Sequence, residues 1–192
     1  MPRLVTKVLS GSLLLSSLAG ASADAGTFSS KYDGEIERAA KRWWPDLPYW
    51  KLWKAQLYQE SQLDPLAVSP VGARGLAQFM PATWQDITGR MGRAGGSPVD
   101  PDLAIEAGAF YMAQLRLTWR RDRTSAQRNP LAQASYNAGT GSILKAQARC
   151  NDARMWPEIA PCLEAVTGAK FSHETRTYVE RIDRWWRQME ME

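Results

Sequence analysis

One glutamate, Glu60, has sequence surroundings that suit a general acid. The spacing of the segment 49–63 predicts a helix, on which Trp53, Leu57 and Glu60 follow one another at intervals of four and three. Those intervals place the three side chains on one face. A glutamate on an apolar face is partly withdrawn from water, which raises the pKa of its carboxyl and lets it donate a proton near neutral pH. The alternative, a glutamate at the rim that points to water or pairs with an arginine, stays open on helical position alone.

Other chemistries have few residues to work with. The chain has one histidine, His173, which excludes histidine-rich metal sites and leaves only that residue for a hydrolase triad. The two cysteines are not spaced as a zinc site. The sequence contains no nucleophile turn, phosphate-binding loop or dinucleotide fingerprint. We therefore expect carboxylate chemistry, with no cofactor and no metal.

Four motifs follow in order along the chain. They are Glu60-Ser61, Gly75-Leu76-Ala77-Gln78, Ser135-Tyr136-Asn137-Ala138-Gly139 and Glu174-Thr175-Arg176-Thr177-Tyr178-Val179. Together they closely resemble the soluble lytic transglycosylase (SLT) domain, family 1 of the lytic transglycosylases in the lysozyme-like superfamily. The resemblance covers roughly residues 43–185. It implies an all-α, lysozyme-like helical domain that cleaves the glycan strands of peptidoglycan.

The resemblance assigns a role to each matched residue. It implies that Glu60 is the catalytic acid and base, and that Ser61 steadies either Glu60 or the substrate. Gln78 would hydrogen-bond the sugar in the cleft. Tyr136 would reach toward Glu60, and the implied roles of two further residues are to hold a turn or touch substrate (Asn137) and to line the site (Tyr178).

The family resembled here uses a single carboxylate, whereas most glycosidases need two. Glu60 would protonate the bond between MurNAc and GlcNAc and then deprotonate the C6 hydroxyl, which closes a 1,6-anhydro ring without water. Asp64 could be a second acid, but its place before Pro65 reads more simply as a turn. Two residues depart from the family pattern. Ala77 replaces a methionine, which we expect to remove bulk from the cleft wall, and Ser135 replaces an alanine.

The segments that must position these residues read almost entirely as helix. Proline and glycine signals divide them. We predict helices over 35–44, 49–63, 75–80, 81–87, 102–121, 130–137 and 174–189, with a flexible glycine-rich loop over 89–98. Apolar residues wrap most of the 102–121 helix, which indicates a central position. No strand is predicted, so the fold class is all-α.

Composition is that of one globular domain. The chain has 192 residues, 44% of them hydrophobic and 23% charged, and a formal charge of +4. This mild positive charge favours binding to an anionic polymer, but it does not indicate which polymer. Nucleic-acid binding needs a recognisable module as well, and none is present. We expect a monomer over residues 31–192.

The N-terminus predicts export. A basic start, an apolar run over 8–19 and Ala21-Ser22-Ala23 are typical of a signal peptide over 1–23. Residues 24–30 would form a loose leader, and the protein would be periplasmic or secreted. A signal anchor that holds the chain at a membrane remains an alternative.

The two cysteines agree with export. Cys150 and Cys162 bracket a short segment and could close a disulfide worth about 3 kcal/mol. Two buried free thiols are the alternative.

Three functions stay open at this point. The first is a lytic transglycosylase, the second a hydrolytic muramidase on the same fold, and the third a non-catalytic wall-binding protein. Intact Glu60, Ser61, Gln78 and Tyr136 argue against the third. Small proteins of the family resembled here serve wall turnover, the passage of a secretion or conjugation apparatus through the wall, or phage lysis.

Overall fold

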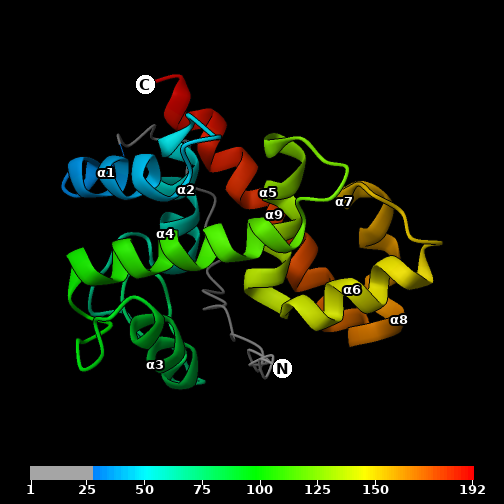
Figure 1. The fold of residues 1–192 in the computed structure, drawn as a ribbon, viewed down its shortest axis with the longest axis horizontal. Coiled ribbons are helices and arrows are strands. Elements are labelled where there is room, and N and C mark those ends of the chain that lie inside the picture. The colour runs from blue at the N-terminus through cyan, green and yellow to red at the C-terminus, as the bar shows by residue number, and fades with distance from the viewer. Residues whose placement is uncertain (1–27) are drawn as a thin grey trace, which may run out of the picture.

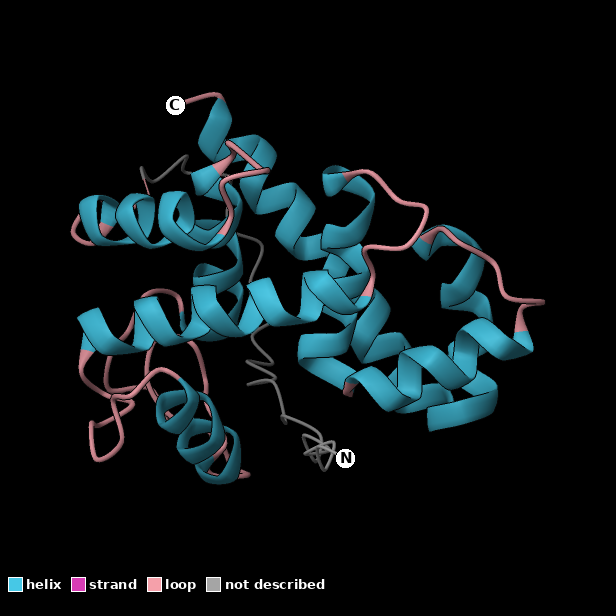
Figure 2. Ribbon diagram, in the orientation of Figure 1, coloured by secondary structure: helices cyan, strands magenta, loops and turns pink. Residues whose placement is uncertain are grey.

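The computed structural model describes residues 28–192, and helices make up its framework (Figures 1 and 2). Within that range there is no strand, only isolated bridges between Val68 and Arg74 and between Arg74 and Phe79. The prediction of an all-α fold is therefore confirmed. In chain order the elements are α1 (Asp33–Trp43), α2 (Trp50–Ser61), α3 (Pro81–Arg90), α4 (Pro101–Thr118), α5 (Ser125–Ala138), α6 (Thr140–Arg149), α7 (Trp156–Ile159), the 3₁₀ helix η1 (Ala160–Leu163), α8 (Glu164–Thr167) and α9 (Ala169–Glu190).

Two long helices, α4 and α5, form the centre of the molecule. In Figure 1, α1 and α3 lie on one side, α6 and α8 gather on the other, and α9 runs diagonally between them. Helix α4 packs against α1, α3 and α5, and α5 packs against α4, α6 and α9. Every residue over 131–139 is buried, so α5 is enclosed more completely than α4, whose Leu117 is exposed. The central position predicted for the 102–121 helix is thus shared with α5.

The helix starts follow local chemistry. Pro81 begins α3 at a position where its missing N–H costs nothing. Asp100 caps α4 by accepting a hydrogen bond from the backbone N–H of Leu103. Thr124 forms a capping box with Gln127, so α5 begins five residues earlier than predicted and carries Pro130 inside its length.

The helix predicted over 75–80 is wrong. Gly75 and Gln78 have φ angles of 75° and 45°, which a helix does not allow, and Arg74 and Phe79 pair as a bridge across the turn. Gly75, the first residue of this segment, adopts a positive φ angle at little cost, which favours a turn over a helix. The helices α6, α7 and α8 had not been predicted, and α9 begins at Ala169, right after Gly168 (φ 80°).

Ordered packing begins before residue 31. Phe28 lies within the predicted leader, yet its ring packs edge to face on Tyr58 at 5.0 Å and on Trp185 at 6.3 Å between centroids. The predicted signal peptide lies outside the described residues. Among the residues that are described, no helix is both long and apolar enough to cross a membrane.

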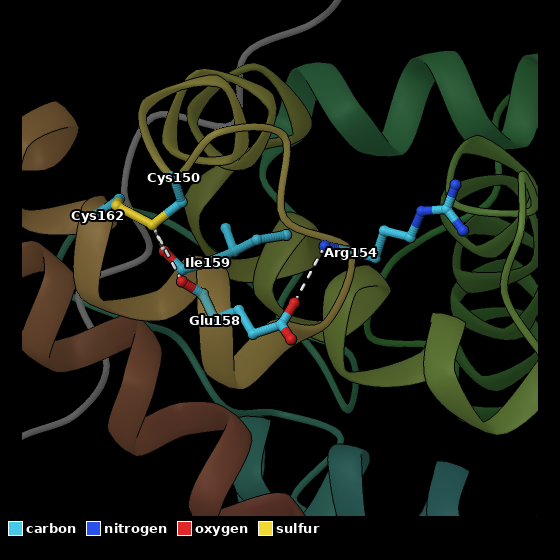
Figure 3. The surroundings of a disulfide bond; sticks show 5 residues. All are labelled: Cys150, Arg154, Glu158, Ile159 and Cys162. Atoms are coloured by element: carbon cyan, nitrogen blue, oxygen red, sulfur yellow. Dashed lines mark hydrogen bonds between the residues drawn. A yellow bond between two sulfur atoms is a disulfide. The ribbon is translucent and has the colours of Figure 1, made fainter.

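The predicted disulfide is present (Figure 3). Cys150, after the last residue of α6, is joined to Cys162 in η1, with 5.9 Å between their Cα atoms. Between them, the Glu158 carboxylate accepts a hydrogen bond from the backbone N–H of Arg154 (Figure 3). The bond therefore closes a short loop that ties α6 to the segment before α9.

Candidate active site

Glu60 lies in the last turn of α2. On the same face, Trp53 and Leu57 are completely buried, while Glu60 is half-buried. The helix thus anchors itself in the core through its apolar residues and presents the carboxyl at its C-terminal end. The adjacent Gln62 has a φ of 55° and turns the chain out of the helix.

Tyr178 of α9 holds the Glu60 carboxyl. Its hydroxyl donates a 2.6 Å hydrogen bond to Oε1 of Glu60. The Tyr178 side chain is 3% exposed, and burial raises its pKa well above the usual value, with the negative charge of Glu60 as the next cause. A phenol that stays protonated is a permanent donor, so the carboxyl is held in one orientation at any physiological pH.

Tyr136 of α5 lies deeper in the same region. It is completely buried, and its hydroxyl donates a 2.7 Å hydrogen bond to the carbonyl oxygen of Ala77. Burial raises its pKa well above the usual value, and the charge of Glu60 raises it further. Tyr136 is therefore within electrostatic reach of Glu60 while it ties α5 to the loop after α2.

That loop, residues 62–80, is fixed to the end of α2. The Ser61 hydroxyl lies 3.0 Å from the carbonyl oxygen of Leu76, to which it can donate. The buried Gln78 donates through Nε2 to the carbonyl oxygens of Ala67 and Gly75, at 3.1 and 3.0 Å. Ser61 and the amide nitrogen of Gln78 thus shape the loop that flanks Glu60.

Asn137 connects α5 to α9. It is 4% exposed, and its Oδ1 accepts a 2.7 Å hydrogen bond from the hydroxyl of Thr175. Thr175 lies one turn before Tyr178 on α9. This hydrogen bond joins α5 to the helix that carries Tyr178.

The sequence did not single out Gln56, and it named Glu174 only as part of a motif. Gln56, one turn earlier on α2, is completely buried, and neither atom of its amide has a hydrogen-bond partner of normal geometry in the described chain. It is nonetheless close enough to Tyr178 to lower the pKa that burial and Glu60 raise. Glu174 lies one turn before Tyr178 on the same face of α9 and is half-buried. The i and i+4 spacing of each was the available signal.

The remaining predicted features have plain structural roles. Asp64 is exposed, and its Oδ1 accepts a hydrogen bond from the backbone N–H of Leu66, which confirms the turn. Ala77 is completely buried, and a Cβ added to Gly108 would lie 3.2 Å from it. The expectation that Ala77 thins the cleft wall is therefore wrong, because the residue packs against α4. Ser135 accepts a hydrogen bond from the buried indole N–H of Trp119.

Comparison with known proteins identifies the family of this chain. The profile of the Transglycosylase SLT domain matches residues 49–159, more than half of the chain. The membrane-bound lytic murein transglycosylase F of Desulfosudis oleivorans is 32% identical over 163 residues, which cover 77% of this chain and 34% of that protein. Its namesake from Yersinia pestis is 31% identical over 150 residues, 71% of this chain and 30% of that protein. The chain thus spans about a third of the length of these relatives.

Solved structures share the fold. The lytic transglycosylase Slt of Pseudomonas aeruginosa, solved as an inactive glutamate-to-glutamine mutant, is 26% identical with a TM-score of 0.66 over 83% of this chain and 24% of its own. The 70 kDa soluble lytic transglycosylase of Escherichia coli is 24% identical with a TM-score of 0.67, over 84% of this chain and 24% of its own.

Proposed function

This chain belongs to the transglycosylase SLT domain family, and on that premise we propose that it is a peptidoglycan lytic transglycosylase. It cleaves the β-1,4 bond between MurNAc and GlcNAc and leaves 1,6-anhydro-muramic acid ends. The observation that carries the proposal is the half-buried Glu60 at the end of α2, held by the Tyr178 hydroxyl at 2.6 Å. A carboxyl fixed in this way can protonate a leaving oxygen and then take up a proton.

The mechanism proposed for Glu60 has two steps. As an acid, Glu60 donates its proton to the glycosidic oxygen while the bond from that oxygen to C1 of MurNAc breaks. As a carboxylate, it removes the proton from the C6 hydroxyl of the same sugar, whose oxygen then bonds to C1. The internal hydroxyl is favoured over water because a well-placed group acts at a very high effective concentration. The solved Pseudomonas aeruginosa relative supports an essential glutamate, since its inactive form carries glutamine in place of a glutamate.

The product tests the proposed reaction. Purified glycan strands digested by the protein should yield muropeptides that end in 1,6-anhydro-muramic acid, each lighter by one water than the reducing product of a hydrolase. Mass spectrometry separates the two. Reducing ends as the main product would overturn the transglycosylase and establish the hydrolytic muramidase.

A pair of variants tests the single-carboxylate mechanism. Glu60→Gln keeps the shape of the side chain but cannot deliver a proton, so cleavage should fall by about two to four orders of magnitude while the fold survives. Asp64→Asn is the matched control, because Asp64 is an exposed carboxylate one turn after Glu60 that accepts a hydrogen bond within a turn. It should retain most of the activity. Equal losses of activity at both positions would support a hydrolase that uses two carboxylates. If the folded wild-type protein gives no product at all, only the wall-binding function would remain.

In this proposal, residues 31–192 form the catalytic domain. The domain cleaves the peptidoglycan of the cell wall, outside the cytoplasm. N-terminal sequencing of exported protein should find a start at or near Asp24. A membrane-bound form that keeps its first residues would instead support the signal anchor. We expect the chain to be a monomer. A secretion or conjugation apparatus is its proposed partner, and co-purification of the chain with such an assembly would support that partner.

A further inference from the structure

A cavity of about 550 Å³ lies between α5 and α9, on the face of α9 turned away from Tyr178. Each helix contributes four lining residues, and both sets follow the spacing i, i+3, i+4 and i+7. The residues are Ala126, Asn129, Pro130 and Gln133 of α5, and Arg176, Val179, Glu180 and Asp183 of α9. Residues at this spacing form one continuous stripe on a helix surface. Two packed helices therefore face the same gap, each with about two turns of a stripe.

The loop closed by the disulfide forms a third wall of the cavity. Four of its residues line the cavity, and all of them lie between Cys150 and Cys162: Trp156, Pro157, Ala160 and Pro161. The disulfide fixes both ends of this loop. The gap is therefore bounded by two helices and by a covalently closed loop.

The buried part of the lining is mainly apolar. Besides the two amides of α5, it consists of five residues that are each at most 8% exposed: Leu47, Leu52, Trp156, Ala160 and Val179. Two aromatic rings extend the apolar surface to the rim, those of Trp186 and Tyr49, whose centroids lie 5.5 Å apart. The cavity can therefore take apolar side chains of a ligand out of water, which stabilises a complex.

The α9 edge of the cavity is acidic. Glu180 and Asp183 are exposed there, three residues apart, and Arg176 lies one turn before Glu180. Asp183 pairs with Arg187 at 2.8 Å, whereas Glu180 has no ion-pair partner among the described residues. The edge thus offers one carboxylate that is available to a cation and a second that is shared with an exposed arginine.

The cavity is separate from the site of Glu60. Leu52, in the first turn of α2, lines the cavity, whereas Glu60 lies eight residues later on the same helix. A helix rises 1.5 Å per residue, so the two positions are about 12 Å apart along its axis. A ligand in the cavity therefore does not occupy the catalytic site.

We propose that an amphipathic helix of a partner protein docks in this cavity, with its apolar stripe on the buried part of the lining and basic side chains beside Glu180 and Asp183. Two packed helices that each present a stripe to one gap leave the kind of space that a further helix fills in a helical bundle. A helix bound in a groove uses apolar anchors at i, i+3, i+4 and i+7, the spacing of both stripes here. The shape of the cavity thus selects a helix.

The charges of the rim select a basic helix. A lysine or arginine of the docked helix can pair with Glu180, whereas an acidic helix would be repelled by both carboxylates. Ala126, at the exposed start of the α5 stripe, is small and lets a helix backbone come close. Docking there would hold the chain at a partner and leave the site of Glu60 open.

The test uses the wild-type chain and a synthetic, alanine-based helical peptide that carries a stripe of leucines with lysines along one edge. Calorimetry measures the affinity, and the NMR signal of the Trp186 indole N–H, assigned with Trp186→Phe, locates the binding. The peptide should bind and shift this signal. Two peptides are the matched controls, one with the leucines distributed around the helix and one with glutamate in place of each lysine. Each should lose about tenfold or more in affinity.

Variants of the rim test the position and the charge of the site. Ala126→Trp places a bulky ring at the edge of the cavity and should abolish binding, while the fold survives because Ala126 is exposed. Glu180→Arg should weaken binding of the lysine peptide by about fivefold or more and strengthen binding of the glutamate peptide. Asp102→Arg is the matched control, since Asp102 is an exposed carboxylate of α4 outside the lining, and it should change neither affinity. Cleavage of short glycan strands should be unchanged in all three variants.

Several results would overturn the inference. They are no binding of the leucine–lysine peptide, equal binding of either control peptide, binding that survives Ala126→Trp, and tighter binding of a basic, proline-rich peptide that cannot form a helix. A dimer of the chain alone that Ala126→Trp dissociates would assign the cavity to a second copy instead. Product analysis of the wild type keeps the two proposals apart. Anhydro products without peptide binding would reject only this inference, and peptide binding without products would reject only the proposed reaction.

Discussion

The hydroxyl of Tyr178 and the carboxyl of Glu60, 118 positions apart in the chain, are joined by a 2.6 Å hydrogen bond. It links the last turn of α2 to the middle of α9, two helices that pack closely together. Because Tyr178 is buried and stays protonated, this contact orients the one acid on which the proposed reaction depends.

Tyr178→Phe removes that hydrogen bond and little else. A hydrogen bond to a charged group is worth about 1.5–3 kcal/mol, so kcat/KM should fall by roughly one to two orders of magnitude. The limb of the pH–rate profile that reports ionisation of Glu60 should also move to higher pH, because the lost bond favours the carboxylate. Steady-state rates across pH check both effects. An unchanged profile would mean that Tyr178 serves packing alone.

Gln56→Leu tests a positioning role for the buried amide beside Tyr178. Both amide atoms are without a partner of normal geometry, so an apolar residue of similar size should leave the free energy of unfolding equal or higher. If the amide orients the Tyr178 hydroxyl, kcat should nevertheless fall several-fold and the pH profile should change. Denaturant unfolding and pH-dependent rates measure the two quantities separately. Full activity with a wild-type pH profile would exclude the role.

Gly75→Ala should disrupt the loop that carries Gln78. Gly75 has a φ of 75°, and a Cβ there would lie 1.7 Å from the carbonyl oxygen of Pro98. Gly72→Ala is a matched control, since its φ is 86° but nothing lies within 4 Å of an added Cβ. The control should cost about 1–2 kcal/mol of stability through its backbone alone. Gly75→Ala should lose more stability than the control and should also lower cleavage, which thermal unfolding and activity assays measure. Equal losses of stability in the two variants would mean that the loop can shift to accommodate the added Cβ.

Replacing Cys150 and Cys162 with serine tests the disulfide. A loop of this length predicts a loss of about 3 kcal/mol, or roughly 10 °C in melting temperature. Cleavage at low temperature should persist, because Tyr178, which holds the Glu60 carboxyl, lies on α9 and outside the loop between the cysteines. Calorimetry with and without reductant measures the effect, and a wild-type melting temperature for the variant would contradict it.

Alkaline pH should destabilise the fold. Burial raises the pKa of Tyr111 to about 12, and it raises the pKa values of Tyr136 and Tyr178 well above their usual value near 10. The unfolded chain releases these protons near pH 10, whereas the folded chain retains them. The stability that they contribute is therefore complete below pH 10 and falls as pH rises above it. Unfolding free energies on either side of pH 10 measure the slope, and Tyr178→Phe should reduce it.

The sequence by itself identified the proposed acid, predicted the helix that carries it and determined the fold class. Trp53, Leu57 and Glu60 share a face because helical spacing is a local property, and Pro81 begins a helix for an equally local reason. The pairing of Cys150 with Cys162 also followed from a short separation. Where the sequence failed locally, at residues 75–80, Gly75 and Gln78 have positive φ angles, and both donate hydrogen bonds to the carbonyl oxygen of Ala67.

Only the tertiary structure decided which side chains reach Glu60. The packing of α9 on α2 gives Tyr178 the hydrogen bond to Glu60, while Tyr136 donates to the Ala77 carbonyl. The same packing brings Gln56 beside Tyr178. These contacts join residues about 60 to 120 positions apart, and the register between packed helices depends on the fit of whole surfaces, which local spacing does not encode.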